Sequence, residues 1–584
     1  MWKSLRAGAM ASGMVGLLLN GCGQSRPPQA PTKTESPASQ AWKKTANGFM
    51  EEYLQTNPFF AAQQGRHEFD GELTDLSAHG LKRLAAMLHD GQKTVSAVDP
   101  ATLEPREQFD REYLLAVISR DLFWLEKSQF PSKNPGWYLQ NLDPDMFLSR
   151  DYAPLDVRMK AYIKYARNVP KMAKDIQDNL KSPMPKSYVE LGIAQFGGLQ
   201  DFFAKSVAPV FASVSDPALQ KQLTDANTNA ANAMGTLKAY LVGERKNAND
   251  NFAFGPDLFA QMLKDTELVD MPVDQIEAAG KADLDRNTEA LKTECAAYAP
   301  KATLAQCVAK VDANKPKLGP VEEARAMLPT LKDFVVQNKV VSIPNDTQAL
   351  VAEAPPYNAQ NAAYINVPGP FDHGVASTYN IAPPDPKWSK AEQQAYIKGE
   401  AILLFTTVHE VWPGHFLQFL VSNSNPNKLE ALWIGNAYAE GWAHYCEEMM
   451  VEMGLAKGDP EKHIGQLVDA LLRDVRLLSA IGLHTKGMTT AQSEKMFREQ
   501  AFQDPGNARQ QAARGTYDPA YLVYTMGKLM IRKLRTDWVA KTVPNAAPDD
   551  QSHWHDFHDA FLSYGGPPIP LVRKQMVGAG GALL

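Results

Sequence analysis

Cysteine is scarce in this sequence, and the few cysteines lie far apart. Only four occur among 584 residues, at Cys22, Cys295, Cys307 and Cys446. This scatter argues against a zinc site built from thiolates. Cys295 and Cys307 are twelve residues apart and could close a small loop in an oxidising compartment, which permits disulfides. Cys446 falls inside an apolar helical pattern and is expected to be a buried thiol.

Long apolar runs and an excess of positive charge are also missing. No segment after residue 25 has 18 consecutive apolar residues, so no internal segment is predicted to span a bilayer. The sequence has 60 Lys and Arg and 66 Asp and Glu, which gives a net charge of -6. That balance lacks the basic footprint of a nucleic-acid-binding protein. A content of 44% hydrophobic residues is typical of a globular protein with a large core.

The first residues have the pattern of a bacterial secretory signal. Lys3 and Arg6 give a short positive region, and residues 7–19 are apolar or small. A charged start, a short apolar region and small residues at the cleavage site are typical of such signals, so residues 1–21 are predicted to be removed. The final Leu-Asn-Gly-Cys resembles a lipobox, which implies diacylation of the Cys22 thiol. A plain signal peptide with an incidental cysteine is the alternative.

Residues 22–40 are predicted to be a flexible tether, because they are rich in proline, serine and threonine. A lipid on Cys22 would then hold the protein on the periplasmic side of a bacterial membrane. Gly23 stands where inner-membrane retention usually requires aspartate, which favours the outer membrane.

Residues 41–584 are predicted to form one mainly α catalytic unit with two helical lobes. Apolar residues recur there at helical spacing, and proline or glycine marks where helices stop. The clearest helical stretches are 41–55, 109–125, 155–180, 230–241 and 271–291.

A small sheet is predicted at about 335–383, just before the most informative helix. Its candidate strands are β-branched or aromatic and are separated by turn residues. They are 340–344, 363–367 and 377–381. Ser389, with Glu392 three residues later, forms a capping box that predicts the start of a helix. The helical pattern then resumes and includes the predicted metal core, at about 395–530.

A strongly apolar helix at 401–420 contains His409, Glu410 and His415. Zinc peptidases commonly take two histidine ligands from one helix, with a glutamate beside the first histidine as general base. Zinc lowers the pKa of its water to about 7, and the glutamate passes a proton from that water to the leaving amine. The pattern predicts one Zn²⁺ ion, with His409 and His415 as ligands and Glu410 as base.

The spacing of the two histidines is unusual for such a site. They are six residues apart rather than four, which places them about 120° apart around a regular helix and disfavours a shared ion. Pro413 and Gly414 lie between them. An interior proline costs roughly 3 kcal/mol or more, and glycine tolerates unusual dihedral angles. We therefore predict that the helix breaks at Pro413-Gly414 and brings His415 back toward His409.

The third ligand is predicted 25 residues after His415. Glu440 interrupts an apolar and small-residue face of the helix 437–450, and a buried carboxylate needs a partner such as a metal. His444 shares that face and is the alternative ligand. Glu447, seven residues after Glu440, is expected to support a ligand histidine by a hydrogen bond.

Four ordered sequence blocks resemble the bacterial family called domain of unknown function 885. HEVWPGHFLQ and AEGWAHYCE match its two metal-ligand blocks. RGTYDPAYLVYTMGK, residues 514–528, matches a third block loosely, and WHDFHDAFLSYGG, residues 554–566, matches a fourth. The resemblance covers most of the chain after the tether.

This family is similar to the gluzincin peptidases, mostly helical enzymes that bind zinc with two histidines and one glutamate. The resemblance implies a large, two-lobed, gluzincin-like fold with a small sheet before the zinc helix. It also implies His409, His415 and Glu440 as ligands, with Glu410 as the base.

Further candidates concern the substrate side of the site. Peptide hydrolysis develops negative charge on the carbonyl oxygen, and a hydrogen-bond donor must meet it. Tyr517, Tyr524 and His484 are the candidates for that donor. Arg514 or Lys528 could bind a substrate carboxylate. A packing tyrosine or a surface cation is the structural alternative for each.

The sequence therefore predicts a zinc metallopeptidase that hydrolyses short peptides in the periplasm, of carboxypeptidase or dipeptidase type. One alternative is a non-catalytic lipoprotein that binds zinc or a solute. Another is a metal-dependent hydrolase of a different amide or an ester. Glu410 distinguishes the first alternative, because a pure binding site does not need a carboxylate beside its first histidine. No oligomeric state is indicated.

Overall fold

Helices dominate the structure, together with a small three-stranded sheet, as the sequence predicts. The computed structural model describes residues 35–354, 362–386, 388–547 and 550–584. The predicted signal peptide and Cys22 lie outside the described residues. Among the helices of the described part, none is long and apolar enough to cross a membrane.

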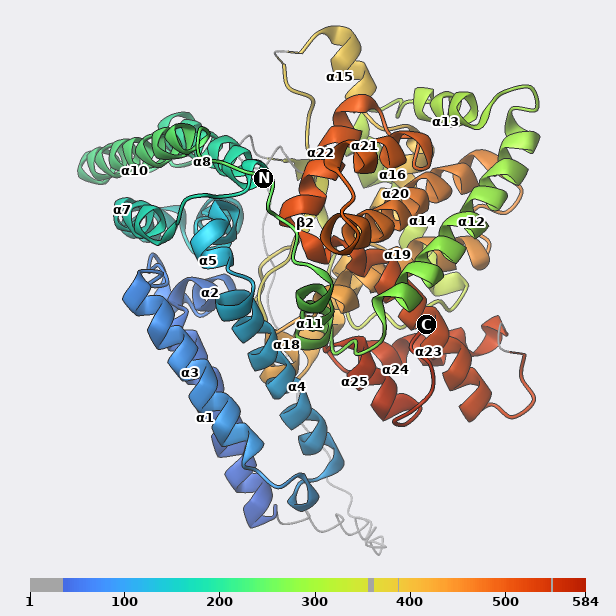
Figure 1. The fold of residues 1–584 in the computed structure, drawn as a ribbon, viewed down its shortest axis with the longest axis horizontal. Coiled ribbons are helices and arrows are strands. Elements are labelled where there is room, and N and C mark those ends of the chain that lie inside the picture. The colour runs from blue at the N-terminus through green and yellow to red at the C-terminus, as the bar shows by residue number, and fades with distance from the viewer. Residues whose placement is uncertain (1–34, 355–361, 387, 548–549) are drawn as a thin grey trace, which may run out of the picture.

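The first helices form one arm of the molecule, drawn in blue in Figure 1. They are α1 (Pro37–Thr56), α2 (Pro58–Gln63), α3 (Ala78–Ser96) and α4 (Pro105–Leu122). Phe49, Leu88 and Tyr113 are buried in the core of this arm. The Ser36 side chain caps α1 and Pro37 takes its first position, so residues 37–40 are helical rather than part of the predicted tether.

A second group of helices is built around α7, α8 and α10, to the left in Figure 1. Its members are α5 (Phe130–Lys133), α6 (Asp145–Ser149), α7 (Leu155–Asn179), α8 (Lys186–Lys205), α9 (Val207–Val210) and α10 (Pro217–Glu244). The long helix α10 packs along both α7 and α8. These helices enclose a separate core that includes Tyr162, Phe203 and Met234.

The remaining helices surround the largest core. They are α11 (Pro256–Glu267), α12 (Val273–Tyr298), α13 (Leu304–Ala313), α14 (Pro320–Gln337), α15 (Lys390–Tyr396), α16 (Glu400–Glu410), α17 (His415–Ser424), α18 (Lys428–Leu432), α19 (Asn436–Glu452), α20 (Pro460–Thr485), α21 (Thr490–Glu499), α22 (Pro505–Tyr517), α23 (Val523–Thr542), α24 (Trp554–Leu562) and α25 (Ile569–Met576). Helix α20 packs against α12 and α16, and α19 packs against α23. Four of the helices that carry predicted site residues, α16, α19, α20 and α23, therefore meet in this core.

The sheet lies against this core, with β3 as its central strand. Its strands are β1 (Leu350–Glu353), β2 (Ala363–Asn366) and β3 (Thr378–Ile381). Strand β3 pairs in parallel with β1 and antiparallel with β2, and Tyr379 lies opposite both Val351 and Ile365. The predicted strands at 363–367 and 377–381 are thus confirmed. Strand β1 was not anticipated.

The predicted strand at 340–344 is wrong. Val340 donates its N–H to the Val335 carbonyl at the end of α14, and its own carbonyl accepts from His558. The Ser342 N–H donates to Asp559. Helix ends and side chains bond this backbone, and no strand of the described part pairs with it, although Val340 and Val341 are buried as their sequence suggests.

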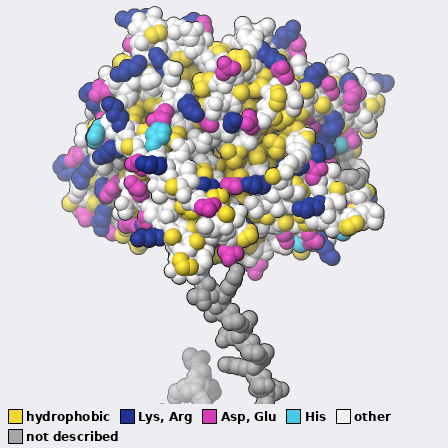
Figure 2. Space-filling model, turned by 60° about the horizontal axis from the view of Figure 1, so that its bottom comes forward, with side chains coloured by type: hydrophobic (Ala, Val, Ile, Leu, Met, Phe, Trp, Pro, Cys, Tyr) yellow, Lys and Arg dark blue, Asp and Glu magenta, His cyan; other side chains and the backbone are white. Residues whose placement is uncertain are grey.

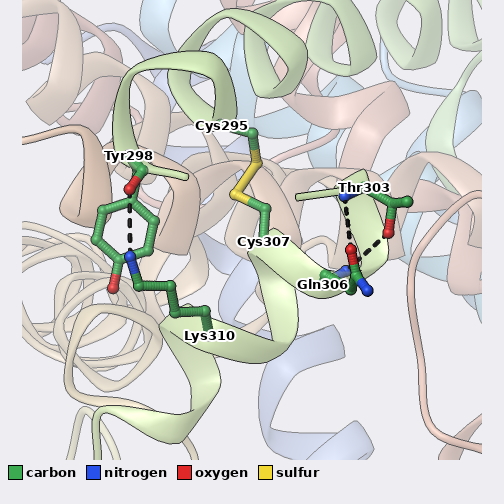
Figure 3. Close-up of a disulfide and its surroundings, with 6 residues drawn as sticks. All are labelled: Cys295, Tyr298, Thr303, Gln306, Cys307 and Lys310. Atoms are coloured by element: carbon green, nitrogen blue, oxygen red, sulfur yellow. Dashed lines mark hydrogen bonds between the residues drawn. A yellow bond between two sulfur atoms is a disulfide. The ribbon is translucent and has the colours of Figure 1, made fainter. Parts of the chain in front are cut away.

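The disulfide that the sequence left open is formed between Cys295 and Cys307 (Figure 3). It joins the end of α12 to α13, whose start is fixed by a capping box of Thr303 and Gln306. Cys446 is free and buried, as expected. On the face drawn in Figure 2, cationic and anionic side chains are interspersed, in keeping with the near balance of charge in the sequence.

His67 links the N-terminal arm to the loop between β2 and β3. Its ring nitrogens lie 3.1 Å from Asp70 and 2.9 Å from Asp372, and the ring stacks on Tyr152 at 3.9 Å. Burial lowers the pKa of His67, but the two carboxylates outweigh it and raise the pKa to about 9. The protonated ring therefore stabilises the folded state.

We predict a pH-dependent effect of His67→Gln on thermal stability. The folded-state pKa lies above the ordinary 6.5, so the stabilisation is complete below about pH 6.5 and is lost as pH rises through about 9. The melting temperature of the variant should fall most below that of the parent at pH 6, with the gap closing by pH 9.5. His79→Gln, an exposed position on α3, is the control and should show no such trend. A gap independent of pH would contradict the prediction.

Candidate metal centre

The helix predicted at 401–420 is broken where the sequence indicates. Helix α16 ends at Glu410 and α17 begins at His415. Between them the Gly414 N–H donates to the Val408 carbonyl, six residues back, at 3.1 Å. A Cβ on Gly414 would lie 1.8 Å from the His409 carbonyl oxygen, so only glycine allows this close approach. The chain therefore doubles back, as predicted from Pro413-Gly414.

A tryptophan from the next ligand-bearing helix holds this break in place. The Trp442 indole N–H donates to the Pro413 carbonyl at 2.9 Å, and the ring is fully buried. Because Trp442 lies on α19, the break is fixed relative to the helix that carries Glu440. The two imidazole rings meet with centroids 4.8 Å apart at an interplanar angle of 88°.

His409, His415 and Glu440 converge on one point. Glu440 Oε2 lies 3.4 Å from His409 Nε2 and 3.3 Å from His415 Nε2, and the three ligand atoms all lie within 4.8 Å of one another. Bonds of about 2.0–2.1 Å to a tetrahedral ion imply ligand separations of roughly 3.3–3.4 Å. Among the described residues, Glu440 Oε2 is buried without a hydrogen-bond partner. The donor set and its spacing thus fit a metal ion.

Glu440 reaches this point because α19 and α23 approach closely. A Cβ on Gly441 would lie 2.6 Å from the Gly527 Cα, so the two glycines let the backbones touch. This contact brings Tyr524 to Glu440, and the Tyr524 hydroxyl donates to Glu440 Oε1 at 3.0 Å. Burial would raise the pKa of Glu440, but both histidines outweigh it and hold the pKa well below its usual range.

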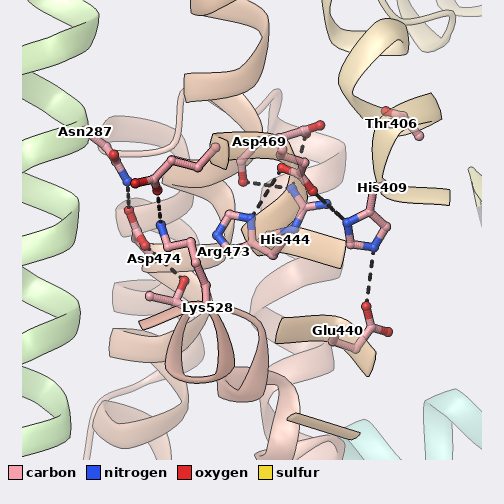
Figure 4. Close-up of polar contacts among 12 residues, drawn as sticks. Asn287, Thr406, His409, Glu440, His444, Asp469, Arg473, Asp474 and Lys528 are labelled. Atoms are coloured by element: carbon pink, nitrogen blue, oxygen red, sulfur yellow. Dashed lines mark hydrogen bonds and ion pairs between the residues drawn. The ribbon is translucent and has the colours of Figure 1, made fainter. Parts of the chain in front are cut away.

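Glu447 supports His409 from behind, as predicted. Its Oε1 lies 2.6 Å from His409 Nδ1, which leaves Nε2 directed at Glu440 (Figure 4). Arg473 on α20 lies 3.0 Å from the same Oε1. Burial would raise the pKa of Glu447, but Arg473 and the neighbouring histidines lower it strongly. The carboxylate is therefore ionised and fixes the orientation of the His409 ring.

His444, the alternative ligand, faces Glu447 instead of the three converging side chains. Its Nδ1 lies 3.3 Å from Glu447 Oε2, and the ring is fully buried. Burial, together with the charge of Lys528, lowers the pKa of His444 to about 4, so the ring is neutral. His444 therefore helps to hold the Glu447 carboxylate in place.

Glu410 follows His409 on α16 and is 8% exposed. Burial raises its pKa, against the opposing charges of His409 and His415. Tyr379 on β3 is near enough for the Glu410 charge to raise the pKa of its phenol, in addition to burial. Glu410 is thus a buried carboxylate close to both predicted histidine ligands and to Tyr379 of the sheet.

The other predicted site residues separate into two groups. Tyr524 contacts Glu440, and Arg514 lies next to Tyr524, pairing with Asp518 at 2.9 Å. Tyr517 is half-buried at the end of α22, where burial raises its pKa and Arg514 opposes the rise. Of these, Tyr524 is the side chain in direct contact with a candidate ligand, Glu440.

His484 and Lys528 are held in structural contacts. His484 Nε2 lies 2.8 Å from the Gly515 carbonyl, and its Nδ1 accepts the Phe254 N–H, so both ring nitrogens are used. Lys528 is fully buried and pairs with Asp283 and Glu448. This packing is that of a buried ion cluster, in which the ammonium group is closed to a substrate carboxylate.

Two arginines on α20 were missed by the sequence reasoning. Arg473 contacts Glu447, and Arg476 lies over the Tyr524 ring at 5.0 Å. They are three residues apart and so share one helix face. Cations recurring within the apolar pattern of 464–484 were the available signal, because buried cations need a partner or a function.

Two solved structures resemble this fold. A proposed lipoprotein of unknown function from Shewanella oneidensis matches with a TM-score of 0.73 and 23% identity, covering 92% of this chain and 99% of that one. One from Colwellia psychrerythraea matches with a TM-score of 0.77 and 17% identity, covering 93% and 99%. At these identities the likeness concerns the fold alone. A search among curated proteins found no significant match.

The sequence blocks around the metal centre also match a family description. Residues 58–576 match the family described as bacterial protein of unknown function, DUF885. The match includes all three converging ligands, Glu410, Glu447 and Tyr524. The chain therefore belongs to the DUF885 family.

Proposed function

We propose that this protein is a zinc-dependent peptidase that hydrolyses short peptides. The observation that carries the proposal is the convergence of His409, His415 and Glu440, with Glu410 on the same helix as the first ligand. Two imidazoles and one carboxylate form a donor set that zinc accepts in hydrolytic enzymes, and three protein ligands leave a position for water. The mainly α architecture with its small sheet is in keeping with a gluzincin-like peptidase.

The side chains around the three candidate ligands have the following roles in this proposal. A bound zinc ion would polarise the attacking water and lower its pKa. Glu410 takes the proton from that water and delivers it to the leaving amine. The Tyr524 hydroxyl, whose present acceptor is Glu440, is the donor proposed for the carbonyl oxygen as it becomes negative. Glu447 and Arg473 keep His409 oriented.

The cellular location is proposed from the N-terminal pattern. The two similar structures are of proposed lipoproteins, and the sequence ends its apolar signal at Leu-Asn-Gly-Cys22. We propose a lipid anchor on Cys22 at the periplasmic side of a bacterial membrane, with the outer membrane favoured by Gly23. Short periplasmic peptides are then the accessible substrates, and a carboxypeptidase or dipeptidase mode is the proposed activity.

Metal binding should depend on Glu440 and, more weakly, on Glu447. Glu440→Gln should reduce bound zinc from one ion per chain to near zero, because it removes a ligand. Glu447→Gln should retain the ion with affinity lowered about 10- to 100-fold, because His409 loses its orienting partner. Zinc content after dialysis and competition with a chromophoric chelator measure the two effects.

Glu294→Gln is the matched control for Glu447→Gln. Glu294 also pairs with a histidine, His463, at 2.9 Å, but away from the three converging ligands. Its zinc affinity should equal that of the parent. Full zinc occupancy in Glu440→Gln would contradict the assignment of this ligand.

Glu410→Gln should retain zinc and lower the rate of peptide hydrolysis by about 10²-fold or more, because proton transfer is removed while the ligands remain. Digestion of a peptide library, read by mass spectrometry with and without chelator, measures the activity. Glu400→Gln, in the first turn of the same helix, is the control and should hydrolyse normally. An active Glu410→Gln protein would exclude the proposed base.

Membrane attachment should depend on Cys22. In a bacterial host, Cys22→Ser should abolish incorporation of labelled fatty acid and release the protein into the soluble periplasmic fraction, because the acylated thiol is gone. Cys446→Ser is the control, because this thiol is buried and should leave labelling unchanged. Continued labelling of the Cys22→Ser protein would refute the anchor.

A further inference from the structure

Three arginines surround the ring of Tyr524, and two of them have carboxylate partners. Arg473 pairs with Glu447 at 3.0 Å, and Arg514 pairs with Asp518 at 2.9 Å. Arg476 differs: its Nε–H donates to the amide oxygen of Gln511 at 2.9 Å. Among the described residues, no carboxylate forms an ion pair with Arg476.

Arg476 nevertheless lies deep in the protein and beside the metal centre. Its side chain is 9% exposed, and its guanidinium lies 5.0 Å from the centre of the Tyr524 ring. That ring also stacks near His409, with centroids 6.4 Å apart, and its hydroxyl contacts Glu440. The Tyr524 ring is therefore a shared neighbour of the Arg476 guanidinium and of the candidate ligands His409 and Glu440.

The charges around Arg476 make this position unfavourable without an anion. Burial lowers the pKa of Arg476, and the neighbouring charges of Arg514 and Arg473 lower it further, to about 10. A buried cation usually has an ionic partner, and an isolated one destabilises the fold. No carboxylate in the described ranges pairs with the terminal nitrogens of Arg476, while Gln511 accepts a hydrogen bond only from its Nε.

A guanidinium presents a rigid fork of N–H donors that matches a planar carboxylate. We propose that Arg476 binds the C-terminal carboxylate of a peptide whose scissile bond lies at the metal centre. This inference rests on the proposed peptidase function and names its substrate class, peptides with a free C-terminus. It also replaces Lys528, which is enclosed by its own carboxylates, as the carboxylate-binding cation.

The test is a competition between two forms of one peptide mixture. Acetylated tetrapeptides of mixed sequence are prepared with a free C-terminal carboxylate and with a C-terminal amide, and both are offered to zinc-loaded Glu410→Gln protein. Bound peptides are released and quantified by mass spectrometry. The acid form should be retained at least about tenfold over the amide, the range of a charge-assisted hydrogen bond.

Two variants in that background locate the effect. Arg476→Met should abolish the preference for the acid. Gln511→Glu should reduce it strongly while keeping Arg476, because a carboxylate at the hydrogen-bond position of Gln511 would neutralise the guanidinium; this nearly isosteric change guards against misfolding of the first variant. Arg498→Met, an exposed arginine on α21, removes the same charge and should leave the preference intact.

The outcomes separate this inference from the peptidase proposal. Equal retention of acid and amide, no retention of either, or an undiminished preference in both Arg476→Met and Gln511→Glu would overturn the role of Arg476. Hydrolysis of amidated and free peptides at equal rates by the parent would also overturn it, while leaving the peptidase proposal intact. An acid preference lost in Arg476→Met, with no hydrolysis by the parent, would overturn catalysis alone.

Discussion

The hydrogen bond from Trp442 to the Pro413 carbonyl fixes the helix break between the two histidines of the candidate metal centre relative to the helix that carries Glu440. The chain between His409 and His415 cannot remain helical, because a proline lacks the N–H that a helix requires and Gly414 packs against the His409 carbonyl. A break alone leaves many relative orientations open. The indole N–H from α19 selects one of them and does so two residues after Glu440. This one hydrogen bond thus fixes the relative positions of the three candidate ligands, which lie on α16, α17 and α19.

Buried charged side chains then hold the helices around the break in position. Arg473, Glu447 and His409 form a continuous series of contacts from α20 through α19 to α16. A buried carboxylate held by a cation and two imidazoles stays ionised, and removing any one partner leaves an uncompensated charge. Lys528 of α23, labelled in Figure 4, is the centre of a second buried cluster with Asp283 of α12 and Glu448 of α19. The buried polar groups of this core therefore hold the helices in position and also orient the candidate ligand His409.

Against this background Arg476 is the exception. The other buried cations of the region have carboxylates from the protein, whereas Arg476 has an amide oxygen and two neighbouring positive charges. A buried guanidinium without an ionic partner favours the binding of an anion. Arg476 and the candidate ligands His409 and Glu440 neighbour the same Tyr524 ring, so the proposed carboxylate site lies beside the candidate metal centre.

The sequence by itself determined which residues are the candidate ligands and where the helix breaks. His409, His415 and Glu440 were predictable because two imidazoles and a carboxylate in apolar helices need a partner, and Pro413-Gly414 marks the only place where the spacing could be corrected. The mainly α fold followed from helical periodicity, and two of the three strands followed from β-branched and aromatic composition; both are local properties. Glu447 followed from the same helical repeat.

Only the tertiary structure decided which cations face the site. Lys528 lies deep because Asp283, from α12, and Glu448, from α19, enclose it, and no local pattern encodes such an encounter between distant segments. His484 is likewise taken by backbone groups of other segments. The stretch at 340–344 has strand composition, but its hydrogen bonds go to a helix end and to α24. The local sequence shows which side chains are charged or can bind a metal. Which of them pair with one another depends on which helices pack together in the fold.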